Sequence, residues 1–439
     1  MKNFHIITYG CQMNVHDSEQ MAGLLQTIGY SRSASPEDAD VILLNTCSIR
    51  EKAAHKLYSR LGKLRPLKDK NPGLLIGVCG CVAQQEGEQI FAQVPSVDFV
   101  LGTKAIPRLP HILEALEVRP RVIDVGEYVW EREDDNIVRE CRFKAYITIM
   151  RGCDNFCAYC VVPYTRGREE SRPSAEIVSE ARHLADDGVL EVTLLGQNVS
   201  SYADPSGAAP AFPDLLKAVH AVEGLRRLRF ITAHPKDVSP ELAEMMARLP
   251  NVCRHFHLPC QAGADHVLEL MNRRYTRQWY LSRVELLRRA MPDIAITTDI
   301  IVGFPGETDV DFQQTLTLLE EVRYDSIFAF QYSDRPNAKA TGLPDHVSDA
   351  VKSERLQQVL ELQRRLSLEK HSTMIGRTLE VLPESINPRF PDTLTGRTRG
   401  NHVVTLQAPE TFLGTLVSVK ITEAFPYRLS GEIVEEKCP

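Results

Sequence analysis

Three cysteines lie close together in the run RGCDNFCAYC, where Cys153, Cys157 and Cys160 have CxxxCxxC spacing. Three thiolates on one short loop can each bind one iron of a four-iron cluster, which leaves the fourth iron without a protein ligand. An open metal position can bind a substrate, as it does in catalytic zinc sites. Structural zinc is the alternative, but it usually has paired CxxC spacings, and the loop contains no histidine. The spacing therefore favours an iron–sulfur cluster with an open site.

Three further cysteines follow separate apolar, β-branched segments: Cys11 follows FHIITYG, Cys47 ends DVILLNTC, and Cys81 ends LLIGVCGC. If these segments are parallel strands, their carboxyl ends meet at one edge of a sheet and the three thiols come together. Filling of the core is the alternative role for each cysteine taken alone. The polar or small neighbours of all three favour ligation of a second cluster. Cys79 is predicted to point into the apolar layer instead.

The cysteines need a scaffold, and residues 2–118 alternate between strand and helix patterns. Helices are predicted near 18–28, 50–63, 84–93 and 106–116, between the strand-like segments. Such alternation with short turns is typical of a parallel sheet covered by helices, so this part is predicted to be an α/β domain. The charged stretch EYVWEREDDN at 127–136 is predicted to be a linker.

The same alternation recurs six times in residues 139–369. The candidate strands are AYITIM, VLEVTLL, LRFIT, CRHFHL, IAITTDIIVG and SIFAFQY, with a helix expected at 175–185 after the first. Six units predict a partial (β/α)6 barrel, in which chemistry occurs at the carboxyl ends of the strands. Residues 372–435 change to period-two segments broken by Gly and Pro, which predicts a small all-β barrel or sandwich. The whole chain is therefore predicted to be an α/β protein of three domains.

Composition limits the class of protein. Of 439 residues, 43% are hydrophobic and 25% are charged, as in soluble globular proteins. No apolar run reaches the roughly 18 residues of a spanning helix, and the start MKNFHIITYG does not resemble a secretion signal, so we expect a cytoplasmic protein without a membrane partner. In that reducing compartment, 11 cysteines are better explained by metal ligation than by disulfides. The net charge of -7 requires any RNA binding to use local basic patches.

Two such patches are candidates for phosphate contacts. Residues 50–70 hold eight Lys or Arg residues, Lys52 and Lys56 among them, and only two acidic residues. The second patch follows the CxxxCxxC loop and comprises Arg166, Arg168 and Arg172. A row of cations can follow phosphates, although a basic helix face is often only solvated, and both alternatives stay open. The all-β domain holds six basic and seven acidic residues, so its charge does not indicate RNA binding.

Several segments together resemble a known family. YGCQMN, NTCSIREKA, GCVAQ, RGCDNFCAYCVVPYTRGREESRP, LGQNVSSY and IIVGFPGET, in this order, are similar to the methylthiotransferase family of radical S-adenosylmethionine enzymes over nearly the whole chain. The resemblance implies an amino-terminal methylthiotransferase domain, a radical S-adenosylmethionine barrel and a carboxy-terminal TRAM domain. It implies two 4Fe-4S clusters and S-adenosyl-L-methionine as cofactors. It also implies that Tyr159 lies against the cofactor's adenine and that Gln197 helps to hold its methionyl part.

Within the family, the cysteine-containing runs are most similar to members that act on tRNA. The implied reaction gives N6-dimethylallyladenosine at position 37, next to the anticodon, a 2-methylthio group. The C2–H bond of adenine is unactivated and no protein base could remove its proton, which explains the need for a radical. The implied partners are tRNA, an external electron donor and a sulfur source, and we expect a monomer.

Two alternatives come from other substrates or classes. The first is a family member that acts on a ribosomal protein or on threonylcarbamoyladenosine in tRNA. The second is a non-catalytic iron–sulfur carrier with an RNA-binding tail, which would have little need for an open cluster site or a six-unit barrel.

Two runs depart from the family pattern. LPCQAGA, with Cys260, Ala262 and Ala264, replaces the family's LP, an apolar residue and QSGS, and Asn337-Ala338 replaces a usual Gly-Thr. Both runs are predicted to lie near the cofactor and substrate. We therefore expect them to affect the choice of substrate rather than the type of reaction.

Overall fold

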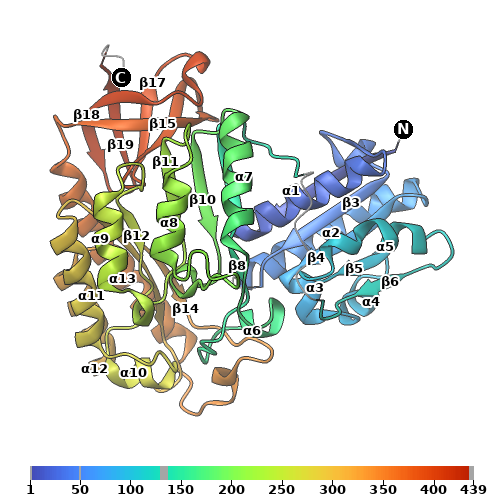
Figure 1. Ribbon diagram of the computed structural model, residues 1–439. Coiled ribbons are helices and arrows are strands. Elements are labelled where there is room, and N and C mark those ends of the chain that lie inside the picture. Colours follow the sequence, from blue (N-terminus) through green and yellow to red (C-terminus); the bar gives the residue numbers. More distant parts are fainter. Residues whose placement is uncertain (1, 49–50, 129–136, 435–439) are drawn as a thin grey trace.

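The computed structural model describes residues 2–48, 51–128 and 137–434, which fold into three regions in chain order (Figure 1). A helix-covered sheet, blue in the figure, lies beside a partial barrel, and a small β-barrel, red, lies at one end of the partial barrel. Most of the predicted linker, residues 129–136, falls outside the described residues. In the parts of the chain that are described, no helix is both long enough and apolar enough to cross a membrane.

The amino-terminal sheet has six strands, and all neighbouring strands are parallel. Across the sheet they are β2 (Ser31–Arg32), β1 (Asn3–Tyr9), β3 (Val41–Thr46), β4 (Leu75–Gly80), β5 (Phe99–Leu101) and β6 (Val122–Asp124). The central strands β3 and β4 are mostly apolar because helices cover both faces of the sheet. One face packs against α1 (Gln12–Thr27) and α5 (Leu109–Ala115), and the other against α2 (Glu51–Lys70), α3 (Cys81–Glu86) and α4 (Gln89–Gln93). The predicted parallel-sheet domain is confirmed.

Three predicted helices have different bounds in the structure, and one of them, α1, begins at Gln12, six residues before its predicted start near residue 18. Helix α2 continues seven residues beyond the predicted end at residue 63 although it contains Pro66, which costs about 3 kcal/mol inside a helix. Its apolar stripe stays buried past that point, and Lys68 Nζ lies 2.8 Å from an Asp98 carboxylate oxygen, so tertiary contacts outweigh the proline. The single helix predicted near 84–93 is divided into α3 and α4, because Gly87 takes a positive φ of 53° and ends α3.

The central region contains six parallel strands, which confirms the predicted partial barrel. They form two sheets of three, joined by a parallel bridge between Leu228 and Val252. In order around the barrel they are β7 (Lys144–Thr148), β10 (Glu191–Leu195), β11 (Arg227–Phe230), β12 (His255–His257), β13 (Ala295–Val302) and β14 (Ser326–Gln331). The outer helices are α7 (Ser174–Asp186), α8 (Phe212–His220), α9 (Pro240–Arg248), α11 (Arg277–Ala290), α12 (Asp309–Val322) and α13 (Asp349–Ser372). Helix α7 is the helix predicted at 175–185.

Strand alternation separates two environments in this barrel. Apolar side chains such as Ile147, Val192 and Phe256 face the helices and form the largest core. Their neighbours in sequence point inward, and many of them are polar or charged, including Glu191 and His255. Because the inner layer is not filled by branched apolar residues, as it is in closed barrels of this type, the barrel interior can hold a polar ligand.

The carboxy-terminal region is a closed barrel of five strands, so of the predicted all-β barrel or sandwich the barrel is confirmed. In order around the barrel they are β15 (Thr378–Asn387), β16 (Phe390–Thr398), β17 (Val403–Gln407), β19 (Arg428–Ile433) and β18 (Val417–Phe425). This barrel docks on the amino-terminal ends of the central strands through buried charge. Arg227, which is fully buried, donates from Nε to Glu380 Oε1 (2.8 Å) and from Nη1 to the Arg397 carbonyl oxygen (2.9 Å). Lys144 pairs with Glu384 at the same interface.

We expect Arg227→Met to lower the free energy of unfolding by about 3–5 kcal/mol, because it leaves buried acceptors and a carboxylate without their cation. Urea denaturation of the full chain measures this change. Arg248→Ala is the control, since Arg248 and Glu244 form an exposed pair on one helix and their separation should change stability by less than about 0.5 kcal/mol. Equal effects of the two substitutions would contradict the interface described above.

Candidate active site at two cysteine triads

The first group of thiols, which we call the loop triad, comprises Cys153, Cys157 and Cys160. The loop follows β7, and its base is closed by an antiparallel pair of short strands, β8 (Met150–Arg151) and β9 (Glu170–Ser171). At Gly152, with φ of 74°, a Cβ atom would lie 1.9 Å from a backbone oxygen across the loop, so only glycine allows this approach. The closed loop thus holds the three thiols within one short segment.

The surroundings of the loop triad suit metal ligation. Burial raises the pKa of Cys153 and raises that of Cys160 to about 12, and the charge of Cys157 adds to both effects. Three thiolates can exist together here only if cations replace their protons, as in a metal cluster. Two donors already face the sulfurs: Asn155 Nδ2 lies 3.4 Å from Cys153 Sγ, and Arg273 Nη1 lies 3.3 Å from Cys157 Sγ. These residues therefore fit a cluster held by three thiolates.

The second group, which we call the edge triad, comprises Cys11, Cys47 and Cys81. The strand register explains how they meet, because Thr46 pairs with Gly80 and each is followed directly by a cysteine of the triad. Cys11 comes two residues after β1 and directly before α1. The Cys47 thiol interacts with the thiols of both Cys11 and Cys81. The predicted convergence of these three cysteines at one sheet edge is confirmed.

Cys79 points into the apolar layer of the sheet, as predicted. It packs in the apolar core under α1, and burial raises the pKa of its thiol. Cys79 lies within β4, whereas Cys81 begins α3 after Gly80, whose positive φ of 88° turns the chain at the end of the strand.

Two thiols of the edge triad have lowered pKa values, whereas hydrogen bonds with those two thiols, together with burial, raise the pKa of Cys47. The hydrogen bond with Cys47 lowers the pKa of Cys11 to about 6 and that of Cys81 to about 7, and Arg166 lowers both further against the opposing effect of burial. The backbone amides of the first turn of α1 also favour the Cys11 thiolate. Low thiol pKa values favour metal binding, because the thiolate is the ligand.

No group of three Cys, His, Asp or Glu side chains within residues 2–48, 51–128 and 137–434 surrounds a point where a single metal ion would fit. This finding is compatible with a cluster, because each thiolate of a four-iron cluster binds a different iron atom.

The two triads lie near each other. Helix α3, which begins at Cys81, contacts α6 (Val162–Thr165), which begins two residues after Cys160. The Thr103 hydroxyl donates to the Thr165 carbonyl oxygen (2.5 Å) across the same contact. Arg166, at the end of α6, reaches the edge triad and pairs with Asp17 of α1 (Nη2–Oδ2 2.6 Å). The segment that follows the loop triad thus packs directly against the edge triad.

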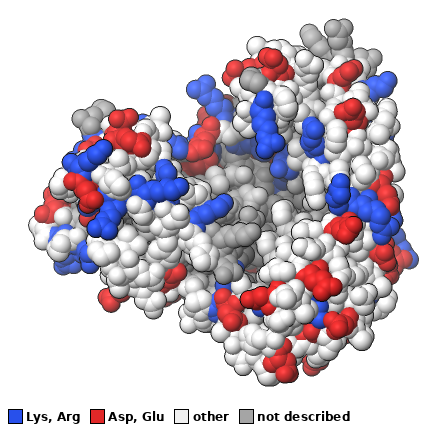
Figure 2. Space-filling view, turned by 180° about the vertical axis from the view of Figure 1, so that it is seen from behind, with Lys and Arg blue, Asp and Glu red and all other residues white. Residues whose placement is uncertain are grey.

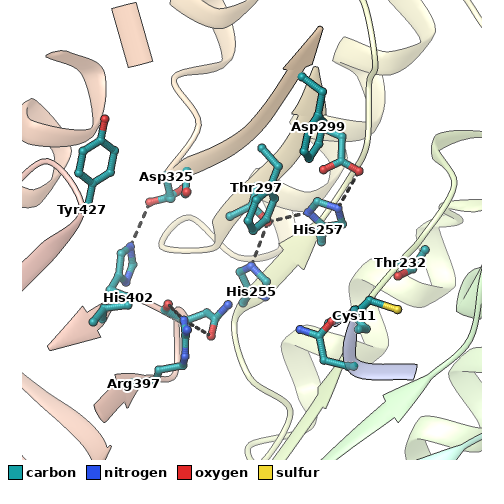
Figure 3. Close-up of a pocket in the computed structure, with 18 of the residues that line it drawn as sticks. Cys11, Thr232, His255, His257, Thr297, Asp299, Asp325, Arg397, His402 and Tyr427 are labelled. Carbon is teal, nitrogen blue, oxygen red and sulfur yellow. Dashed lines mark hydrogen bonds and ion pairs between the residues drawn. The ribbon is translucent and has the colours of Figure 1, made fainter. Parts of the chain in front are cut away.

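A cavity of about 720 Å³ connects the edge triad with the barrel interior. Cys11 and Cys47 lie on its wall, β12, β13 and β14 line its middle, and the carboxy-terminal barrel contributes Arg397 and Tyr427 (Figure 3). From outside, the molecule is hollowed between the amino-terminal domain and the other two domains, with Lys and Arg side chains on the rim (Figure 2). Lys56 and Arg397 are two of the cations that line the cavity.

The cavity wall combines polar groups with exposed aromatic rings. His257 lies 3.5 Å from Asp299 and 3.0 Å from the Thr297 hydroxyl (Figure 3). Burial lowers the pKa of His255 well below its usual value, so this ring is neutral. Phe328 of β14 is 49% exposed, and its ring meets His257 edge to face at 6.0 Å. Such a wall can accept an aromatic, partly apolar ligand with polar edges.

Tyr159 and Gln197 both lie at the carboxyl ends of the barrel strands. Burial raises the pKa of Tyr159, and its hydroxyl accepts a hydrogen bond from Arg273 (3.2 Å). Gln197 follows β10, and its Oε1 is a buried acceptor that has no hydrogen-bond partner among the described residues. An unpartnered buried acceptor fits a role in ligand binding. Their predicted contacts with S-adenosylmethionine stay predictions.

The three arginines predicted to contact RNA differ in exposure. Arg166 and Arg172 are buried and bind Asp17 and Glu180 respectively, which argues against phosphate contacts and favours structural roles. The side chain of Arg168 is 73% exposed and pairs with Asp154. Lys56 is exposed on the cavity wall, whereas the side chain of Lys52 lies outside the described residues.

The departures from the family pattern lie beside the loop triad, as expected. Ala262 and Ala264 pack with Ala158 of the cysteine loop in a small apolar cluster. Cys260 is fully buried. Asn337 has a positive φ of 68°, a conformation that glycine adopts freely and that asparagine tolerates better than other side chains do.

Arg273 and Asn155 were not predicted from the sequence. Neither residue lies in a spacing pattern that indicates ligation, and Arg273 is more than 100 positions from the loop triad that it contacts. The only feature of the sequence that could have indicated a contact with the loop triad was the position of Asn155 between Cys153 and Cys157.

Three family models match the chain. They are described as "Uncharacterized protein family UPF0004" (residues 3–102), "Radical SAM superfamily" (147–319) and "TRAM domain" (372–434). Proteins named tRNA-2-methylthio-N(6)-dimethylallyladenosine synthase are similar over their full length. Those of Moorella thermoacetica (48% identity, 99% of both chains), Geobacter metallireducens (48%, 98% of both) and Carboxydothermus hydrogenoformans (45%, 99% of both) are examples.

Solved structures show a similar fold at low identity. The radical S-adenosylmethionine methyltransferase TsrM from Kitasatospora setae aligns with a TM-score of 0.57 and 14% identity, over 78% of this chain and 75% of that one. The cobalamin-dependent radical enzyme OxsB aligns with a TM-score of 0.51 and 13% identity, over 84% and 56%. At these identities the similarity supports the fold alone.

The difference in burial between Arg166 and Arg168 gives a prediction about stability. We expect Arg166→Met to lower the free energy of unfolding by about 3–5 kcal/mol, because Asp17 would remain buried without its partner. The matched variant Arg168→Met should cost less than about 1 kcal/mol, since its ion pair is exposed. Urea denaturation of both variants tests this, and a similar loss in both would show that the buried pair does not join the two domains.

Proposed function

Because the chain belongs to the family of tRNA-2-methylthio-N(6)-dimethylallyladenosine synthases, which are radical S-adenosylmethionine enzymes, we propose that it adds a 2-methylthio group to N6-dimethylallyladenosine at position 37 of tRNA. The observation that carries this proposal is the contact of α3, which begins at Cys81, with α6, which follows the loop triad, together with a cavity of about 720 Å³ that Cys11 and Cys47 of the edge triad line. A sulfur held at one triad and a radical formed at the other can then reach one substrate atom. A tRNA substrate also fits the predicted cytoplasmic location.

Members of this family use two 4Fe-4S clusters and S-adenosyl-L-methionine. We assign the loop triad to the cluster that binds S-adenosylmethionine, and the edge triad to the cluster that carries the sulfur. When bound, these groups supply the electron that cleaves S-adenosylmethionine and the sulfur that is transferred. The lowered thiol pKa values of Cys11 and Cys81 and the donors that face the loop triad support this assignment.

The chain's own residues bind and orient the reactants. Gln197 offers a buried acceptor for the amino group of the cofactor's methionyl part, and Tyr159 offers a ring for its adenine. The buried Arg166 holds the loop against the edge triad, which fixes the distance between the two reacting sites. Reactants held in a fixed geometry react faster, because the entropic cost of bringing them together has already been met on binding.

We assign the cavity to the target nucleoside. The dimethylallyl group is apolar, and the exposed Phe328 ring in the cavity offers it a surface to bury. His257, paired with Asp299, can hydrogen-bond to the edge of the purine. Phosphates near the target can contact Lys56 and Arg397 at the cavity and Arg168 near the loop. Unstacked loop bases are the usual targets of sequence-specific RNA binding, and the anticodon loop offers them.

The remaining partners are also proposals. The reaction needs an external electron donor and a source of sulfur. We propose that the chain acts as a monomer, because all three domains needed for the cavity belong to one chain.

The division of labour between the triads is tested by replacing Cys11, Cys47 and Cys81 together with Ala. Iron and sulfide content should fall by half from two clusters per chain. The variant should still cleave S-adenosylmethionine to 5′-deoxyadenosine, because its loop triad is intact, but it should form no methylthiolated nucleoside. Anaerobic assays with reductant and tRNA that bears N6-dimethylallyladenosine measure both products.

Cys153→Ala is the reciprocal control and should abolish cleavage while the edge cluster stays bound. Methylthiolation by the triple variant at a rate near that of the original protein would contradict the assignment of the edge triad.

The assignment of the cavity is tested by Phe328→Ala. Loss of an apolar contact to the dimethylallyl group should lower kcat/KM for the prenylated tRNA about tenfold or more. The preference for prenylated over unprenylated tRNA should shrink at the same time. Trp279→Ala is the matched control, because Trp279 is a partly exposed aromatic residue on outer helix α11. If both variants keep the original preference, the prenyl group does not bind at Phe328.

A further inference from the structure

A short turn at residues 271–274 is fastened to the loop that carries the loop triad. It follows α10 (Asp265–Leu270) and precedes α11. The Ala158 amide donates to the Met271 carbonyl oxygen (2.9 Å). Asn272 Nδ2 donates to the carbonyl oxygens of Asn155 (3.3 Å) and Phe156 (3.0 Å). The turn is therefore held in a fixed position over the cysteines.

The backbone of this turn is strained on both sides of Arg273. Asn272 has φ of 57° and Arg274 has φ of 56°, in the left-handed region where a side chain costs about 1–2 kcal/mol. Neither residue is glycine, so the surrounding hydrogen bonds must offset the strain. Strain of this kind commonly persists where the chain must direct a side chain to a functional site. Here it directs Arg273 toward the loop triad.

Arg273 is buried, with 4% of its surface exposed, and its donors are directed at four groups. Nε donates to the Tyr275 hydroxyl (2.9 Å), and Nη2 donates to the Pro259 carbonyl oxygen (2.8 Å). Nη1 faces both the Tyr159 hydroxyl (3.2 Å) and Cys157 Sγ (3.3 Å). Three of these four partners are neutral oxygens, and only the cysteine can become an anion in the protein's normal pH range.

The charge of Arg273 therefore needs a counter-ion. Among the residues that the structure describes, no carboxylate forms an ion pair with it. A buried cation without a compensating anion is costly. The thiolate of Cys157, formed when it binds iron, supplies the missing negative charge at hydrogen-bond distance.

We propose that Arg273 is a positioning residue that raises the reduction potential of the cluster on the loop triad by donating a charged hydrogen bond to the Cys157 thiolate. The proposal rests on the proposed function only in that the loop triad holds a cluster. Adding an electron increases the negative charge on the cluster and its sulfurs, so a fixed cation at a ligand sulfur stabilises the reduced form. Hydrogen bonds to ligand sulfurs are known to set the potential of iron–sulfur clusters. A merely structural role in bracing Pro259 and Tyr275 would leave the potential unchanged.

The test is a redox titration of the full chain with both clusters reconstituted, followed by electron paramagnetic resonance. A background in which Cys11, Cys47 and Cys81 are Ala identifies which signal belongs to the loop triad. Arg273→Met removes the charge and the donor. It should shift the reduction equilibrium toward the oxidised form about tenfold, which is about 59 mV more negative for a one-electron couple. Arg273→Lys keeps the charge without the planar fork and should shift it less in the same direction.

Arg227→Met is the matched control, because Arg227 is also fully buried but lies at the interface with the carboxy-terminal barrel. It should lower stability and leave the potential of the loop cluster unchanged. If Arg273→Met does not assemble a cluster, Arg273→Lys decides the matter. A potential unchanged in the assembled variants, or an equal shift in Arg227→Met, would overturn the proposal. Absence of any cluster on the loop triad of the original protein would instead refute the proposed function.

Discussion

The buried ion pair between Arg166 and Asp17 is the contact on which the arrangement of the site depends. Arg166 ends the short helix that follows the loop triad, and Asp17 lies in the first helix of the amino-terminal domain. A pair removed from solvent adds little net stability, but a docked arrangement that left either charge buried without its partner would be costly, so the pair selects this arrangement of the two domains over others. The same cation lowers the thiol pKa values of Cys11 and Cys81. One interaction therefore brings the two triads close together, and its cation also favours the thiolate forms of Cys11 and Cys81, which are the forms that bind metal.

The other domain contacts follow the same physical pattern. The carboxy-terminal barrel is held by buried arginines at the amino-terminal ends of the central strands, away from the loop triad at their carboxyl ends. The central barrel stays open because its inner layer is polar, and the amino-terminal domain lies beside β7. As a result the cavity has walls from all three domains (Figure 3). A substrate that enters it would contact the edge triad and the barrel at the same time.

Much of this organisation could be predicted from the sequence. Cys47 and Cys81 directly follow apolar strands, and parallel strands bring their ends to one edge, so local pattern was sufficient to predict that they meet. The roles of Arg166 and Arg172 were not predictable in that way, because a basic run shows charge but not burial. Arg273 was missed because its partner Cys157 is distant in sequence and no spacing rule relates them. Helix α2 extended past Pro66 because tertiary packing outweighed local propensity.

The central claim is that two clusters lie near each other at one site, each on its own triad. Electron paramagnetic resonance of the fully reduced protein tests it most directly, because two nearby paramagnetic clusters broaden each other's signals and speed their relaxation. The account predicts such coupling in the original protein, and its loss when either triad is replaced by alanine. Two independent, uncoupled signals would contradict it, because the triads would then be too far apart to act on one nucleoside.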